Sequence, residues 1–95
     1  MRHSSENIII CNLLNTIGET YKDEQNIDSA KYFYNKALQS LNNDTTSEGA
    51  LTKSKLYNNL GELFLFQNKP DFAFSNLTNA ENYALKYTAY PLRSS

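Results

Sequence analysis

The 95-residue chain has no tryptophan, one cysteine, one histidine, three glycines and two prolines. Because the single Cys11 cannot form an intramolecular disulfide, the sequence favours a reducing compartment, and we expect a cytoplasmic protein. No apolar run approaches the roughly 20 residues that a membrane-spanning helix needs, so we expect no membrane association. The short apolar run at 8–11 is interrupted by Asn12 and Asn15 before it could form the core of a signal peptide.

An excess of basic charge is also missing. Nine Lys and Arg stand against ten Asp and Glu, which gives a net charge of −1. A generic nucleic-acid binder carries a basic excess, so we expect no nucleic-acid partner. The adjacent aromatics Tyr32, Phe33 and Tyr34 suggest a stacking platform for single strands. On a helix, however, three consecutive side chains point in different directions, which favours core packing instead.

Side chains for catalysis are few. A nucleophilic Cys11–His3 pair would need an orienting third group and a cleft. Cys11 lies on an apolar helical stripe, where a buried small hydrophobic side chain is the usual role. The sequence has neither a glycine-rich phosphate loop nor a spaced His/Cys set for a metal. We therefore expect no enzyme: no catalytic residue, no metal, no cofactor and no small-molecule substrate.

The apolar spacing predicts four helices and no strand. The predicted inward-facing residues, helix by helix, are Ile10, Leu13, Leu14, Ile17 and Tyr21; Ile27, Ala30, Phe33, Tyr34, Ala37 and Leu41; Leu56, Tyr57, Leu60 and Phe64; and Ala73, Leu77, Ala80, Ala84 and Tyr87. Capping preferences predict where the helices begin. The expected N-caps are Ser4 or Ser5, Asn26 or Asp28, and Thr45 with Glu48 in a capping box, while Pro70 opens a fourth helix that stops near 90–91.

The two halves of the chain align at an offset of about 43 residues. The identical pairs are Leu13/Leu56, Asn15/Asn58, Gly18/Gly61, Glu19/Glu62, Asp28/Asp71, Ala30/Ala73 and Ala37/Ala80. Glycine inside a helix costs roughly 1 kcal/mol relative to alanine. The matched Gly18 and Gly61 therefore predict two places where a neighbouring helix comes too close for a Cβ atom.

These residues resemble the tetratricopeptide repeat (TPR), whose signature is W-x2-L-G-x2-Y, then A-x3-F, then P. The first copy reads Leu14-x2-Ile17-Gly18-x2-Tyr21, then Ala30-x3-Tyr34 and Ala37; the second reads Tyr57-x2-Leu60-Gly61-x2-Phe64, then Ala73-x3-Leu77 and Ala80. The resemblance covers roughly residues 8–87. Asn42 and Leu85 replace the final proline, and the period is about 43 residues. That length is similar to the long-period variety (about 42 residues) of kinesin light chains, cell-polarity adaptors and bacterial peptide-pheromone receptors.

The resemblance implies an all-α fold of two stacked helix-turn-helix repeats, a fragment of a right-handed solenoid. The chain would be one domain over 1–95, with repeat 1 at about 5–42, repeat 2 at about 46–88 and a C-terminal tail at 89–95. The residues that it implies pack the repeats are Gly18, Tyr21, Ala30, Tyr34, Ala37, Gly61, Phe64, Ala73, Leu77 and Ala80.

The resemblance further implies a non-catalytic module that binds a peptide or protein in a groove lined by the first helix of each repeat. The groove candidates are Asn12, Asn15, Glu19 and Lys22 in the first copy and Lys55, Asn58, Asn59, Glu62 and Phe66 in the second. An Asn amide both donates and accepts, so it can pair with a peptide backbone of any sequence. In a chain with thirteen Asn, chance placement is the alternative. For Glu19 and Glu62 the alternatives are a basic ligand or ordinary solvated carboxylates. The alternative function is a regulatory or sensor domain of a signalling protein or transcription regulator.

Two repeats are few for a stacked architecture, which usually has three or more and polar terminal caps. The last predicted helix and the tail carry aromatic and apolar residues with few partners inside four helices: Phe72, Phe74, Tyr87, Tyr90 and Leu92. Such a patch usually marks an interface. We therefore expect either a homo-oligomer, for example a dimer that exchanges helices across 42–50, or a piece of a longer array.

Overall fold

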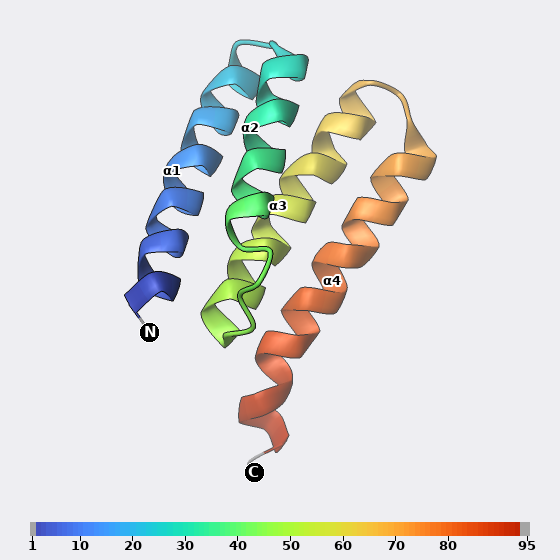
Figure 1. The fold of residues 1–95 in the computed structure, drawn as a ribbon. Coiled ribbons are helices and arrows are strands. Elements are labelled where there is room, and N and C mark those ends of the chain that lie inside the picture. The colour runs from blue at the N-terminus through green and yellow to red at the C-terminus, as the bar shows by residue number, and fades with distance from the viewer. Residues whose placement is uncertain (1, 94–95) are drawn as a thin grey trace.

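The protein, described by a computed structural model, consists of helices α1 (Arg2–Asp23), α2 (Ile27–Ser40), α3 (Ser47–Phe66) and α4 (Pro70–Arg93). The structure describes the backbone of residues 2–93 and the side chains of residues 6–85. Residues 2–93 contain no strand, so the predicted all-helical fold is confirmed. Figure 1 shows the α1–α2 and α3–α4 turns at one end of the molecule and the connection between α2 and α3 at the other.

The helices form two hairpins. Helices α1 and α2 pack along each other, as do α3 and α4, while the hairpins meet through a smaller set of contacts. Helix α3 makes these contacts, since it touches both α1 and α2; within residues 2–93, α4 packs on α3 alone. Helices α1 and α4 therefore lie at opposite edges of the row that Figure 1 shows.

The sequence repeat recurs in the turn that closes each hairpin. Gln25 and Asn68, which are 43 positions apart, both have left-handed backbones, with φ of 64° and 61°. The amide of the residue after each of them donates to the carbonyl five residues back, at 2.8 Å in both turns. This six-to-one hydrogen bond is typical of the Schellman motif, which satisfies the last carbonyls of a helix. The two hairpins thus end their first helix in the same way.

The paired glycines also occupy matching places. A Cβ atom added at Gly18 would lie 2.6 Å from the ring of Tyr34, and one at Gly61 would lie 2.7 Å from the side chain of Leu77. Tyr34 and Leu77 are themselves separated by the repeat length of 43 residues. At each site the second helix of the hairpin approaches the first too closely for a larger residue, which is the feature that the paired glycines predict.

Gly18→Ala is expected to lower the free energy of unfolding by about 1 kcal/mol. The alanine gains about 1 kcal/mol of helix propensity, but overpacking against a buried ring costs typically 1–3 kcal/mol. Tyr34 is fully buried and cannot move aside. Urea denaturation followed by circular dichroism measures the change. The matched control is Gly61→Ala, because the half-buried Leu77 side chain can rotate, so its loss should be smaller. An unchanged or raised stability for Gly18→Ala would contradict the expected clash.

The core lies between the first hairpin and α3. Its buried residues are Cys11, Ala30, Tyr34, Ala37, Leu41, Leu56, Leu60 and Leu63. Leu63 was not among the predicted inward-facing residues, although it is fully buried. The residues that the TPR resemblance assigns to repeat packing are all buried or half-buried.

Two predicted core residues of α1 are exposed instead, so that part of the prediction was wrong. Ile10 is 48% exposed and Leu13 is 61% exposed. Helix α1 turns Cys11 and Gly18 inward, and both are buried. At about 100° per residue, Leu13 lies about 200° around the helix from Cys11, and Ile10 lies about 100° away on the other side. They therefore form a second apolar face, which points away from α2 and α3.

Two of the predicted helix starts are confirmed, at Asn26 and Pro70, and the others are shifted. Asn26 caps α2, since its side-chain oxygen accepts from the amide of Ser29 at 3.3 Å. Helix α3 is capped by Thr46 and not by Thr45, because Asp44 Oδ1 accepts from both the amide (2.8 Å) and the hydroxyl (2.6 Å) of Thr46 and fixes the loop there. Helix α4 begins at Pro70 as predicted and extends to Arg93, beyond the expected stop near 90–91 and into the expected tail.

Helix α1 begins at Arg2, before the caps expected at 4–5. The side chains of some predicted residues lie outside those that the structure describes: His3, Ser4, Ser5, Tyr87, Tyr90 and Leu92. Of the helices in residues 2–93, none combines the length and the hydropathy needed to span a bilayer.

Candidate functional site

Two polar contacts join the helices predicted to line the groove. Asn59 donates a hydrogen bond from Nδ2 to Oδ1 of Asn15 at 2.8 Å. The Lys22 ammonium forms an ion pair with Glu62 at 3.1 Å. Both contacts run from α3 to α1, so four of the predicted groove residues come together in two pairs that also hold the repeats in register. The Lys22 side chain is 22% exposed and that of Glu62 is 48% exposed.

The Asn15–Asn59 pair keeps part of its hydrogen-bonding capacity. A carboxamide has two donor hydrogens and one acceptor oxygen. The contact at 2.8 Å uses one donor of Asn59 and one acceptor position of Asn15. The Asn15 amide nitrogen and the Asn59 carbonyl oxygen therefore stay available to a ligand, and one donor with one acceptor is what a peptide group matches.

The other candidates fall on two surfaces. Asn12, Glu19 and Phe66 are exposed, and Phe66 is 70% exposed. Lys55 and Asn58 instead line a hollow of about 440 Å³ between α3 and α4, together with Leu77 and Glu81. The structure thus divides the predicted groove set. Asn58 lies beside α4, away from the Asn15–Asn59 contact.

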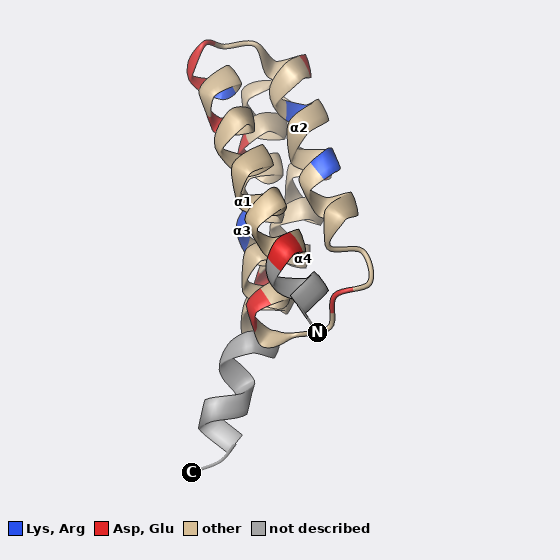
Figure 2. Cartoon of the chain, turned by 60° about the vertical axis from the view of Figure 1, so that its left-hand side comes forward, with Lys and Arg blue, Asp and Glu red and all other residues tan. Residues whose placement is uncertain are grey.

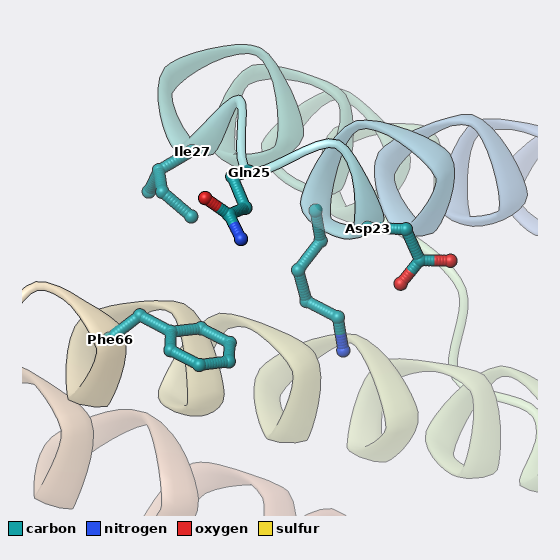
Figure 3. A pocket seen from close by; sticks show the side chains of 5 residues that line it. Asp23, Gln25, Ile27 and Phe66 are labelled. Carbon is teal, nitrogen blue, oxygen red and sulfur yellow. The ribbon is translucent and has the colours of Figure 1, made fainter.

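A pocket lies where the first turn faces the end of α3. It encloses about 570 Å³ and is lined by Lys22, Asp23, Gln25, Ile27 and Phe66. Figure 3 shows the Gln25 amide and the Phe66 ring bordering the same space. The Lys22 side chain reaches from α1 to Glu62 of α3 beside it. Ile27 and Phe66 make its wall partly apolar, while Gln25 supplies a donor and an acceptor. A shallower hollow of about 390 Å³ continues past Phe66 over Glu62 and Leu65.

The pocket contains two predicted groove residues, Lys22 and Phe66, and two residues that were not predicted, Gln25 and Ile27. Residues 23–26 were expected only as a polar break between helices. Gln25, which lines the pocket, has a left-handed backbone conformation. Non-glycine residues seldom adopt that conformation, so no simple sequence signal marks it.

Cys11 is a free cysteine in the core. It is fully buried, and burial raises the pKa of its thiol. The thiolate is the nucleophilic form, so a raised pKa lowers the thiolate fraction of this cysteine at neutral pH. Among the described side chains, no three His, Cys, Asp or Glu residues gather in a way that could hold a metal ion.

The charges of the visible face are scattered. In the view of Figure 2, acidic residues mark the α1–α2 turn and basic residues mark α2, and no continuous stripe of one sign runs along the described part of this face.

Comparison with known proteins finds no matching family model, no similar curated protein and no similar solved structure. Function is therefore inferred from the residues of this chain.

Proposed function

We propose that the chain is a non-catalytic interaction module of the TPR type that binds a peptide or protein partner on the α1–α3 surface. One observation carries this proposal: the 70% exposed ring of Phe66 stands at the edge of a pocket of about 570 Å³, a few turns from the Asn15–Asn59 pair. A large aromatic side chain beside a pocket is the usual anchor of an interface.

The contacts suggest how a partner would be held. An extended segment along α1 and α3 would place a backbone amide and carbonyl opposite the free groups of the Asn15–Asn59 pair. An apolar side chain of the same segment would enter the pocket against Ile27 and Phe66. The Lys22–Glu62 ion pair between these points neutralises both charges, so recognition would rest on backbone pairing and apolar contact more than on net charge.

Phe66→Ala is expected to weaken peptide binding by about tenfold or more, which is the usual loss for an aromatic anchor. Because the ring is mostly exposed, the variant should keep its fold. Ligands are first selected from a random peptide library displayed on phage against the wild-type chain, and fluorescence anisotropy then measures their affinity for each variant.

The matched control is Tyr32→Ala, since Tyr32 is also a mostly exposed aromatic (56%) but belongs to α2. It should bind the selected peptides as wild type does. Asn59→Ala is less informative, because it also breaks the contact between the repeats. A library that yields no ligand, or ligands that bind Phe66→Ala as tightly as wild type, would argue against this site.

A further inference from the structure

The 43-residue offset allows each face of one hairpin to be compared with the corresponding face of the other. The core contains three leucines of α3, Leu56, Leu60 and Leu63, packed with residues of α1 and α2 and with none of α4. One face of α3 is therefore covered entirely by the preceding hairpin. Each residue on that face has a counterpart 43 positions earlier in α1.

The counterparts of these three leucines on α1 are Leu13, Ile17 and Thr20. Together with Ile9, one turn before Leu13, the two apolar counterparts form a largely exposed face, which we call the N-face and define as Ile9, Leu13 and Ile17. Leu13 aligns with Leu56, so both repeats have leucine at this position. Leu56 is 0% exposed, whereas Leu13 is 61% exposed. Ile9 is 67% exposed and Ile17 is half-buried. For two of the three buried leucines of α3, Leu56 and Leu60, the sequence thus keeps an apolar residue at the matching position of α1.

The second hairpin carries the complementary surface; we call it the C-face and define it as Asn58, Leu65, Phe74 and Leu77. These residues correspond to Asn15, Lys22, Lys31 and Tyr34, through which the first hairpin covers α3.

Both cations of that covering set are replaced by apolar residues on the C-face. Leu65 stands where Lys22 would, and Phe74 stands where Lys31 would. Leu65 is 55% exposed and Phe74 is 73% exposed. Exposure of these apolar side chains to water is unfavourable, and packing against another apolar face would remove them from water.

We infer that the C-face binds the N-face of a second copy of the chain, head to tail, in the way that the first hairpin binds α3 within one copy. The occupant follows from continuity with the internal interface, because the N-face holds apolar counterparts of its buried residues Leu56 and Leu60, and the C-face lies at the positions equivalent to its covering residues. This inference shares Leu65 with the hollow beside the α1–α3 groove, and it rests on the proposed function only in treating the chain as an interaction module.

The internal contacts give the register of this pairing. The Asn15–Asn59 hydrogen bond would recur between Asn58 and Thr16 of the second copy. Lys31 lies over the ring of Phe64 with its ammonium 5.0 Å from the centroid. Its counterpart is a contact of Phe74 with Tyr21 of the second copy.

The Lys22–Glu62 ion pair has an unequal counterpart. It would recur as Leu65 facing Glu19 of the second copy, where a carboxylate meets no cation. A lysine introduced at 65 would restore the internal ion pair, and a glutamate there would place two like charges together. The register therefore predicts opposite effects of lysine and glutamate at position 65, which nonspecific association of exposed leucines would not produce.

A head-to-tail contact joins two different faces, so a pair of copies still has one unused N-face and one unused C-face. Association therefore continues beyond the dimer unless the rotation between copies closes a ring. The average mass of the wild-type chain should therefore rise with concentration beyond two copies of 10.9 kDa. Sedimentation velocity over roughly 10 μM to 1 mM covers the weak association expected for small apolar faces.

Two variants that each disable one face test the pairing. Leu13→Arg disables the N-face and Phe74→Glu disables the C-face, and both positions are exposed enough for the fold to persist. Each variant alone should stay monomeric. Their equimolar mixture should form a heterodimer of twice 10.9 kDa and grow no further, because each variant keeps one working face. Tyr32→Arg, on α2, is the matched control and should assemble like wild type, and circular dichroism verifies that all variants are helical.

The charge variants test the register. Leu65→Lys should assemble about tenfold more tightly than Leu65→Glu, since attraction to Glu19 replaces repulsion. The inference is overturned if wild type stays monomeric throughout, if it stops at a dimer that Phe74→Glu preserves, if the mixed variants do not associate, or if the two substitutions at 65 behave alike. Phe66→Ala should assemble like wild type, so failure of the groove and failure of this pairing are distinguishable.

Discussion

Leu63→Ala is expected to lower the free energy of unfolding by about 3 kcal/mol, the largest loss from any single truncation considered for this chain. Leu63 is 0% exposed and belongs to the core that joins α3 to the first hairpin. Truncation removes apolar contacts and leaves a cavity that the helices fill only in part. Domains are typically stable by 5–15 kcal/mol, and one of this size lies near the lower limit, so the variant should be partly unfolded at 37 °C.

The matched control for this change is Leu65→Ala, two residues along the same helix. Leu65 is 55% exposed, so its truncation should change stability by no more than about 0.5 kcal/mol. Urea denaturation of the three proteins, followed by far-ultraviolet circular dichroism, gives both values. Equal effects at 63 and 65 would mean that α3 does not pack on the first hairpin through this face.

Raising the pH from about 10 to 12 is expected to remove roughly 2–3 kcal/mol of stability through Tyr34 alone. Burial, and then the negative charges of Glu19, Glu62 and Asp23, raise the pKa of Tyr34 from 10.0 to about 12. Between these values the unfolded tyrosine loses its proton while the folded one retains it. The unfolded state then binds fewer protons, so stability falls as pH rises. Below pH 10 the contribution is fully present.

Tyr34→Phe isolates this effect from the titration of lysines and other tyrosines. The Tyr34 hydroxyl is buried without a hydrogen-bond partner, so its removal should cost little stability at pH 7. The difference in unfolding free energy between wild type and Tyr34→Phe, measured by urea denaturation at pH 7, 9, 10 and 11, should shift in favour of the variant above pH 10. Parallel pH profiles of the two proteins would contradict the raised pKa.

The repeat made much of the fold predictable because its residues report geometry directly. Gly18 and Gly61 indicate where helices approach closely, and Pro70 and Asn26 mark helix starts in the structure. These signals are local or pairwise, and they need no knowledge of the remaining chain.

The errors arose where environment depends on position in the stack. Leu13 and Leu56 are the same residue at equivalent places, yet one is exposed and the other fully buried. Helical periodicity gives the angle between side chains but not which apolar face a neighbour covers. Leu63 was missed for the related reason that its counterpart is Thr20, so the repeat comparison did not mark it as apolar.

The candidate site was predictable only in part. Residue type and repeat position brought Asn15, Asn59, Lys22 and Glu62 to one surface, but their mutual pairing depends on the distance between α1 and α3. The pocket wall at Gln25 depends on a backbone conformation that glutamine rarely adopts. Such features depend on the three-dimensional arrangement of the helices and turns.

The composition of the core also bears on the order in which the protein folds. Its members are supplied by α1, α2 and α3, and the last of them is Leu63. During synthesis the first hairpin emerges before α3, so Tyr34, Ala37 and Leu41 stay uncovered until α3 has been made. Domains generally fold as units once their cores are complete. We therefore expect the smallest cooperative unit to be three helices, one helix longer than the hairpin that the sequence repeats.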